Sequence, residues 1–343
     1  MRHLLNTLFV LTEESYLSLD GENVVVLDGE QTLGRFLLHT LEGILYFGYK
    51  GASHALMGAC ARGGIGLCFM TSRGRFLART CGESRGNVLL RKTQCRLSDN
   101  EAESCLIARD FIAGKLHNAR WVLERATRDH ALRVDTDRLK GVSTELASAA
   151  RRAAGITCLE ELRGVEGEGA ARYFSVFDEL ILQNKEAFFF QARSRRPPLD
   201  NVNALLSFVY TILTNDCASA LEAVGLDPYM GFLHRDRPGR KSLALDLMEE
   251  LRPAFADRFV LSCINNRIVQ PEHFARQETG AVFLTDVGRR AFLAAYQTRK
   301  KEQITRPFLG EKLPWGLVPY VQALLLARCL RGDLDGYPPF LWK

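Results

Sequence analysis

The chain has 343 residues, of which 47% are hydrophobic and 25% charged. This length lies near the expectation for two domains of roughly 150 residues each, and the composition excludes a disordered or collagen-like chain. The 45 basic and 40 acidic residues leave a net charge of +5, which favours an anionic partner only weakly. No uninterrupted apolar run reaches the ~18 residues of a membrane span, so we expect a cytoplasmic protein without a membrane partner.

The spacing of the cysteines and the choice of basic residues bear on the kinds of site that the protein can contain. Nine cysteines are scattered along the chain and never spaced as C-x-x-C, which argues against both a disulfide scaffold and a zinc knuckle. Only ten of the 45 basic residues are Lys. The planar guanidinium of Arg suits phosphate, but a GC-rich genome would explain the same bias equally well.

The first 80 residues or so contain short β-branched or aromatic runs that predict strands: "NTLFVLT", "ENVVVLD", "GILYFG", "IGLCFMT" and "RFLART". The turn signals between them are "LDGE", which occurs twice, and "SRGR". One segment, residues 51–64, has small residues at helical spacing and predicts a helix. We therefore expect an α+β protein with a small β-rich domain at residues 1–86 and a larger all-α domain at residues 87–343.

The helical periodicity of the second part begins near residue 87. Proline is absent before residue 197, where "RSRRPPLDNVN" predicts a loop between helices. The helices that we expect after residue 100 cover residues 101–129, 201–213, 215–225, 240–251, 285–300 and 314–331.

A carboxylate interrupts an apolar stripe in "LRGVEGEGAARYF", residues 162–174. On a helix, Glu166 shares one face with Ala170, Tyr173 and Phe177, whereas Glu168 points to water. Glu166 therefore needs a partner. A nearby arginine, at position 163 or 172, or a metal ion would satisfy that need.

Further candidate ligands occur in "GFLHRDRPGRKSLALDLMEELRP", residues 231–253. His234 precedes a Pro-Gly turn, and the helix after that turn carries Asp246 and Glu249 on one edge, three residues apart. Two acids and a histidine that converge would suit Mg²⁺ or Mn²⁺. A histidine that caps or packs in the core, with solvated acids, is the other interpretation that spacing allows.

Three motifs in order, "GVEGEGAARYF", "PPLDNVNALLSFVYTIL" and "GLDPYMGFLHRDRPGRKSLALDLMEELRP", resemble the CRISPR-associated integrase of the spacer-acquisition machinery, the larger of its two core adaptation proteins. The wording is most similar to the type I-C branch. The resemblance implies that Glu166, His234 and Glu249 are the catalytic metal ligands, with Asp246 as the neighbouring candidate. It also implies a β domain that forms a homodimer.

The resemblance implies a metal-dependent integrase and endonuclease that inserts foreign double-stranded DNA into a CRISPR array. A 3′-hydroxyl attacks a phosphodiester, and Mg²⁺ or Mn²⁺ polarises the reacting oxygens. The partners that it implies are the CRISPR repeat, the small second adaptation protein bridging two dimers, and, as a further candidate, the CRISPR adaptation exonuclease.

Three basic clusters are candidate contacts to DNA phosphates: Arg193, Arg195 and Arg196; Arg235, Arg237, Arg240 and Lys241; and Arg289, Arg290, Arg299, Lys300 and Lys301. Two rival functions remain open at this point. One is a DNA-binding or assembly protein without catalysis, and the other is a metal-dependent phosphoesterase of small substrates.

Overall fold

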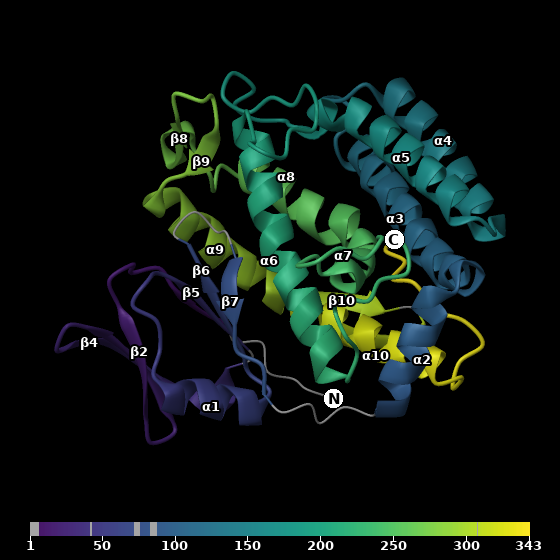
Figure 1. The fold of residues 1–343 in the computed structure, drawn as a ribbon. Coiled ribbons are helices and arrows are strands. Elements are labelled where there is room, and N and C mark those ends of the chain that lie inside the picture. Colours follow the sequence, from purple (N-terminus) through teal and green to yellow (C-terminus); the bar gives the residue numbers. More distant parts are fainter. Residues whose placement is uncertain (1–6, 42, 72–75, 83–87, 307) are drawn as a thin grey trace.

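The structure is a computed structural model that describes residues 7–41, 43–71, 76–82, 88–306 and 308–343. The predicted "SRGR" turn at 72–75 and the predicted domain boundary after residue 86 lie outside these residues. An N-terminal part with two small sheets lies to one side of a larger part made mainly of helices (Figure 1).

The first sheet has the strand order β1-β5-β6-β7. Its strands are β1 (Thr7–Val10), β5 (Gly43–Phe47), β6 (Gly66–Met70) and β7 (Phe76–Arg79). The first three are parallel, and β7 is antiparallel to β6. Helix α1 (His54–Gly63) makes the crossover between β5 and β6, as parallel strands require. This helix is the one predicted from residues 51–64.

The second sheet is an antiparallel meander of β2 (Tyr16–Asp20), β3 (Asn23–Asp28) and β4 (Gln31–Leu37). Its two hairpins turn at Gly21 and Gly29, whose φ angles of 58° and 59° favour glycine. The predicted Asp-Gly turns are therefore confirmed. Strands β2 and β4 were not singled out from the sequence. β4 is exposed along most of its length and has no apolar alternation by which a strand is predicted.

The parallel sheet joins the two parts of the molecule because both of its faces are buried. On β5, Ile44 and Tyr46 belong to the core of the N-terminal part, whereas Leu45 and Phe47 belong to the core of the helical part. This alternation follows the two-residue period of a strand. Phe47 packs against Phe208 of a helix in the larger part, with ring centroids 6.3 Å apart.

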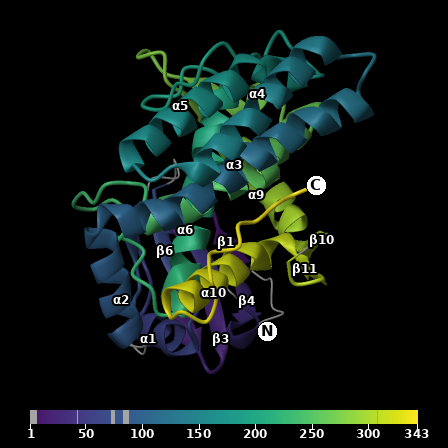
Figure 2. The same cartoon turned by 90° about the vertical axis from the view of Figure 1, so that its right-hand side faces the viewer.

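The helices of the larger part are α2 (Val88–Asp99), α3 (Glu101–Asp129), α4 (Thr136–Gly155), α5 (Leu159–Ser175), α6 (Asn201–Ala223), α7 (Ser242–Glu249), α8 (Arg258–Asn265), α9 (Asp286–Lys301) and α10 (Val318–Leu330). Helices α3, α4 and α5 lie side by side (Figure 2). The two helices predicted over 201–213 and 215–225 are one helix, α6, because no glycine or proline separates them. A wide turn of π type, Arg252–Asp257, links α7 to α8.

The prediction that the second part is all-α is wrong at two places. A ribbon forms between β8 (Phe274–Arg276) and β9 (Val282–Leu284), and another between β10 (Gln303–Arg306) and β11 (Glu311–Pro314). Each ribbon has a positive-φ glycine in its connection, Gly280 or Gly310, which allows the chain to reverse within a few residues.

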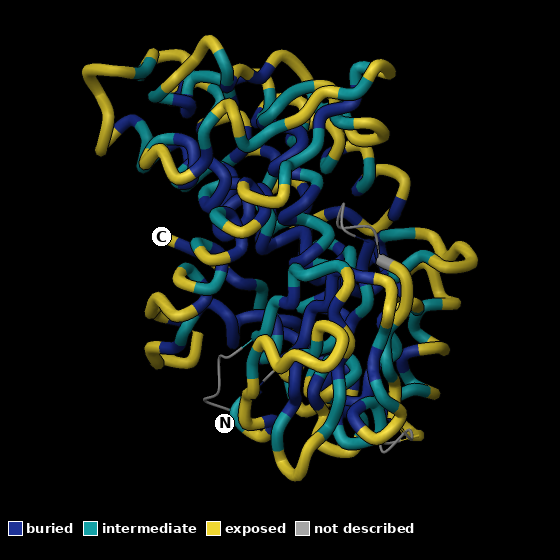
Figure 3. Tube along the Cα trace, turned by 90° about the vertical axis from the view of Figure 1, so that its left-hand side faces the viewer, coloured by how far each residue is buried: buried dark blue, intermediate teal, exposed yellow. Residues whose placement is uncertain are grey.

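Helix α6 occupies the centre of the larger part. Among the described residues it is the one helix of 18 or more residues with the apolar composition to cross a membrane, yet 67% of its most apolar window is buried inside the fold. Buried segments run through the middle of the molecule, and exposed segments surround them (Figure 3).

Candidate metal centre

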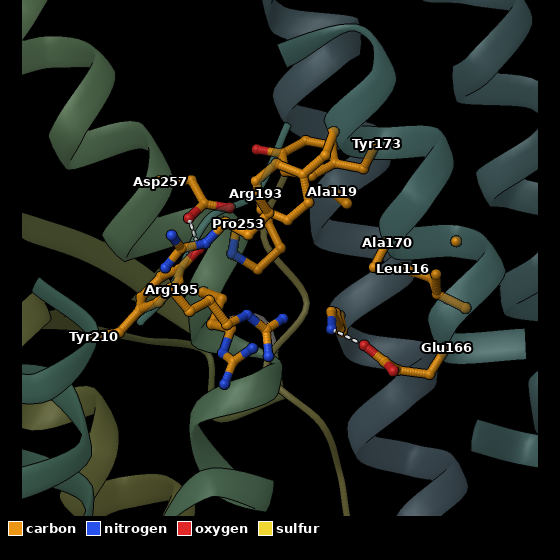
Figure 4. Close-up of a pocket in the computed structure, with 14 residues that line it drawn as sticks. Leu116, Ala119, Glu166, Ala170, Tyr173, Arg193, Arg195, Tyr210, Pro253 and Asp257 are labelled. Atoms are coloured by element: carbon orange, nitrogen blue, oxygen red, sulfur yellow. Dashed lines mark hydrogen bonds and ion pairs between the residues drawn. The ribbon is translucent and has the colours of Figure 1, made fainter. Parts of the chain in front are cut away.

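Three separate elements bring Glu166, His234 and Glu249 together. Glu166 projects from α5, Glu249 ends α7, and His234 lies in the connection before α7. The Nε2 atom of His234 is 3.9 Å from Oε1 of Glu249. A fourth side chain, Lys115 of α3, places its ammonium 2.6 Å from Oε2 of Glu249 and also contacts Oε1 of Glu166. Figure 4 shows the dashed contact to Glu166.

The environment of Asp246 differs from that of Glu249. Asp246 is fully buried and accepts hydrogen bonds from the backbone N–H groups of Phe232, Leu233 and His234, at 2.6 to 3.0 Å. Its Oδ1 atom also lies 2.6 Å from Nδ1 of His234. Because an ionised carboxylate can only accept, Nδ1 of His234 carries the hydrogen and donates it to Asp246. The lone pair of Nε2 is then available on the side of Glu249.

A close approach at Gly231 makes this arrangement possible. A Cβ atom at Gly231 would lie 2.6 Å from Cβ of Ser242 and 3.0 Å from Oδ2 of Asp246. Glycine therefore allows the connection to lie directly on the first turn of α7, where its N–H groups reach Asp246.

The charge of Glu249 is held by two cations. Burial opposes ionisation, but Arg252 and Lys115 outweigh it and lower the pKa of Glu249 to about 2. Arg252 lies in the wide turn after α7, with Nη2 3.2 Å from Oε1 of Glu249. Burial likewise opposes the charged form of Lys115, but Glu249 and Glu166 raise its pKa. The site therefore holds two carboxylates and two cations in a largely buried space.

The donor set has the chemistry of a divalent cation site, two carboxylates and one imidazole with a free lone pair. As they stand, the described residues contain no group of three His, Cys, Asp or Glu side chains close enough to hold a metal ion together. Glu166 and Glu249 do not approach each other closely because the Lys115 ammonium lies between them. A cation already occupies the position between the two acids, so the residues fit a metal whose entry moves that ammonium.

A pocket opens beside Glu166 and is lined by both charged and aromatic residues. Ala170 and Tyr173, which the sequence placed on the Glu166 stripe, line it, so that part of the prediction is confirmed. Across the pocket lie Arg195, Tyr210 and Asp257 (Figure 4). Tyr210 donates a hydrogen bond to Asp257, and the guanidinium of Arg252 lies over the Tyr210 ring.

The interpretation that Glu166 pairs with a nearby arginine is not what the structure shows. Arg163 contacts Glu160 and the carbonyl of Leu233, and Arg172 pairs with Glu145. Glu168 is exposed and pairs with Arg152, as expected for an acid that faces water.

The first two basic clusters lie close to one another around the site. Arg195, Arg196, Arg235 and Arg237 are exposed, and Arg240 is half-buried. Burial lowers the pKa of Arg240, and the nearby charges of Arg237, Arg163 and Arg196 add to that effect. Two members have internal roles, because Arg193 donates to Asn203 and Lys241 donates to Asn215. This basic surface around His234, comprising Arg195, Arg196, Arg235, Arg237 and Arg240, is the strongest candidate for DNA contact.

The third basic cluster is divided by burial. Arg289 and Lys300 are 6% and 3% exposed and lie beside Glu13 and Asp216, at 3.7 and 3.4 Å. Their predicted role as surface phosphate contacts is therefore wrong, because a buried, paired cation cannot reach a DNA backbone. Arg299 pairs with Glu302, whereas Arg290 and Lys301 are exposed.

Lys115 and Arg252 were missed by the sequence analysis. A signal for Lys115 existed, because it interrupts the apolar face of α3 that includes Phe111, Ile112 and Leu116. Nothing in the sequence showed which acid that lysine would meet.

Comparisons with known proteins identify the family of the chain. The family model described as "CRISPR associated protein Cas1" matches residues 8–298. The CRISPR-associated endonuclease Cas1 1 of Chlorobaculum tepidum is 50% identical over 343 residues, the full length of both chains. The chain belongs to the Cas1 family. A Cas4 exonuclease/Cas1 endonuclease fusion of Geobacter sulfurreducens is 36% identical, over 98% of this Cas1-family chain and 60% of the fusion.

Solved structures share the fold of this Cas1-family chain at low identity. A casposase bound to integration product has a TM-score of 0.83 and 21% identity, and the match covers 98% of this chain and 94% of the casposase. A CAS1 protein from Thermotoga maritima has a TM-score of 0.80 and 22% identity, with 96% and 99% covered. A Cas6-RT-Cas1–Cas2 complex has a TM-score of 0.80 and 21% identity, with 100% of this chain and 36% of that chain covered.

Proposed function

We propose that this Cas1-family protein is a metal-dependent DNA integrase and endonuclease that inserts foreign DNA fragments into a CRISPR array. The observation that carries the proposal is the convergence of Glu166, His234 and Glu249 from three elements, beside a basic surface. Family membership supports the nuclease chemistry, and the likeness to a casposase bound to integration product shows a shared fold.

Glu166, Glu249 and Nε2 of His234 would hold the divalent cation, Mg²⁺ or Mn²⁺. When bound, the cation would polarise the phosphoryl oxygen and stabilise the charge on the attacking and leaving 3′-oxygens. Asp246 keeps the hydrogen on Nδ1 of His234, so that the other nitrogen faces the site. The exposed arginines around His234 would hold the DNA backbone in register with that site.

The same site explains strand transfer and cleavage, because a water molecule in place of the 3′-hydroxyl gives hydrolysis. We propose double-stranded DNA, both the foreign fragments and the CRISPR repeat, as the substrate. We also propose that the protein acts in the cytoplasm.

Further parts of the proposal concern assembly and subtype. We propose a homodimer through the N-terminal part, two such dimers bridged by Cas2, and Cas4 as an additional partner. The Cas6-RT-Cas1–Cas2 complex among the structural matches and the Cas4/Cas1 fusion among the relatives support these partners. The wording of the second and third sequence motifs supports the type I-C branch.

The proposal is tested by fragment-into-plasmid integration with the small adaptation partner, with and without EDTA. We expect Glu166→Ala and His234→Ala to abolish integration and to leave duplex binding largely intact, because the metal acts mainly on the transition state. Glu168→Ala, on the exposed side of the same helix, is the control and should retain activity.

Integration at the wild-type level by either site variant would contradict the site assignment. Binding of DNA that ignores EDTA, with no integration by any form, would favour the non-catalytic assembly protein. Turnover of small phosphoesters without salt-sensitive DNA binding would favour the phosphoesterase.

A further inference from the structure

Lys115 is a charged side chain within the site that the proposed reaction does not use. Its side chain is 9% exposed, and its ammonium contacts Glu166 and lies 2.6 Å from Oε2 of Glu249. Transfer of an ammonium from water to a protein interior costs several kcal/mol unless opposite charges compensate. Here the charges of Glu166 and Glu249 offset the cost of burying the ammonium, and the ammonium in turn offsets the cost of burying the two carboxylates.

The ammonium of Lys115 occupies the position that a divalent cation would need in order to contact both acids. Glu166 comes from α5 and Glu249 from α7, and the ammonium from α3 lies between them. The carboxylate oxygens that contact it are oxygens through which a divalent cation would be held. A divalent cation held by both acids cannot share that position with the ammonium, because the two positive charges would repel each other and their atoms would overlap.

The fold gives the ammonium room to move. The pocket beside Glu166 is lined by Lys115 itself, and Tyr210 and Asp257 lie on its opposite side. Asp257 is 1% exposed and within electrostatic reach of Lys115, so it offers a third carboxylate, besides Glu166 and Glu249. The four-carbon stem of lysine is flexible enough to turn between two such positions.

Arg252 does not have the same freedom. Its guanidinium pairs with Oε1 of Glu249 and lies 5.0 Å from the centre of the Tyr210 ring, so it is held from two sides. Of the two cations at the site, Lys115 is therefore the one that bridges both acids and is able to leave.

We propose that Lys115 is a resident counter-cation, which holds Glu166 and Glu249 in the metal-free protein and is displaced into the adjoining pocket when a divalent cation binds. The proposal rests on the proposed function, because it assumes that these two acids are ligands. Lys115 then lowers the affinity for metal and keeps the metal-free site folded.

The experiment compares the wild type, Lys115→Met and Lys140→Met, a control at an exposed lysine on α4. Mn²⁺ alone is titrated into each protein by calorimetry, without DNA, and thermal unfolding is followed in EDTA and in Mn²⁺. We expect Lys115→Met to bind Mn²⁺ at least about tenfold more tightly, because the competing ammonium is gone. In EDTA it should unfold at a lower temperature than the control, and Mn²⁺ should restore most of the difference.

Equal or weaker Mn²⁺ binding by Lys115→Met would overturn the proposal, even if the variant is less stable in EDTA, because Lys115 would then be a structural ion pair. If the methionine variant does not fold, Lys115→Gln keeps a hydrogen-bond donor without the charge, and the same affinity gain is required. Failure of the proposed function gives a different result, namely no Mn²⁺ binding by any form, wild type included, which would overturn both.

Discussion

Asp246 and Glu249 are on one helix, three residues apart, but their oxygens have different partners. The oxygens of Asp246 accept from three backbone N–H groups and from the His234 ring. The charged partners of Glu249 among the described residues are Lys115 and Arg252, and the other ring nitrogen of His234 lies nearby. The oxygens of Asp246 are already occupied by backbone N–H groups, so this carboxylate is a poor candidate for direct contact with a metal. Its role is to hold neighbouring residues in place.

We predict that Glu249→Gln removes metal-dependent cleavage and integration almost entirely. Asp246→Asn should cost about 10 to 100-fold, as expected for a residue that orients a ligand. Mn²⁺ affinity by calorimetry and integration rates under identical conditions would be compared. If Asp246→Asn is inactive and Glu249→Gln keeps near-normal Mn²⁺ affinity, the two roles must be exchanged.

Asp110 on α3 provides a prediction away from the site. Burial raises its pKa from 3.8 to about 6. The folded state therefore binds the proton more tightly than the unfolded state, and ionisation of Asp110 removes stability as the pH rises from about 4 through about 6. Asp110→Asn should be more stable than the wild type at pH 8, by about 1 kcal/mol after allowance for partial exposure, and should gain little at pH 4.

The measurement is thermal or urea unfolding at both pH values, with Asp335→Asn at an exposed position as the control. A stabilisation by Asp110→Asn that is equal at pH 4 and pH 8 would show that ionisation is not its cause.

At the level of elements, the packing of α5 on α3 sets the position of Glu166. A Cβ atom at Gly169 would lie 2.3 Å from Cδ2 of Leu116, and Leu116 is 1% exposed, so it has little room to yield. Gly164, on the same helix, has nothing within 4 Å of such an atom. The two glycines therefore form a matched pair, one required by packing and one not.

We predict that Gly169→Ala destabilises the protein by about 1 to 3 kcal/mol through overpacking and weakens Mn²⁺ binding, because α5 must move away from α3. Gly164→Ala should be neutral or stabilising by up to about 1 kcal/mol, since alanine is the better helix former. Urea unfolding and calorimetry on both variants test this. Equal stability of the two variants would mean that the contact between α3 and α5 tolerates a methyl group.

On the scale of the whole molecule, exposed arginines surround the site, whereas Arg289 and Lys300 of the third basic cluster, on α9, form ion pairs inside the fold. We predict that duplex binding weakens steeply with salt, at a slope of about −0.9 per phosphate contact. Replacing Arg196 and Arg237 with alanine should reduce that slope by about 2. The same change at Arg290 and Lys301, exposed on α9, should reduce it less.

The test is the affinity of each variant for duplex DNA, measured from low to physiological salt. A flat salt dependence would show that these arginines are not a DNA surface. A larger loss for the α9 pair would place the DNA on the other basic surface.

The local features of the fold can be predicted from the sequence alone. The Asp-Gly turns, the helix predicted within residues 51–64 and the α5 stripe that carries Glu166 follow from periodicity and turn chemistry, which act over a few residues. The choice of Glu166, His234 and Glu249 as ligands came from the resemblance to a known family. Exposed strands such as β4, and the short ribbons near Gly280 and Gly310, lacked the apolar alternation or length by which a strand is predicted.

Which charged side chains come into contact depends on the packing of elements that are distant in the sequence. Lys115 lies 51 residues before Glu166 in the chain and reaches it because α3 packs against α5 at Gly169. The different surroundings of Asp246 and Glu249 depend on a separate segment that folds back onto α7, and the burial of Arg289 and Lys300 depends on the N-terminal part that covers α9. Sequence spacing predicts which residues share a face of a helix. The residues that contact that face are determined by the packing of elements distant in the sequence.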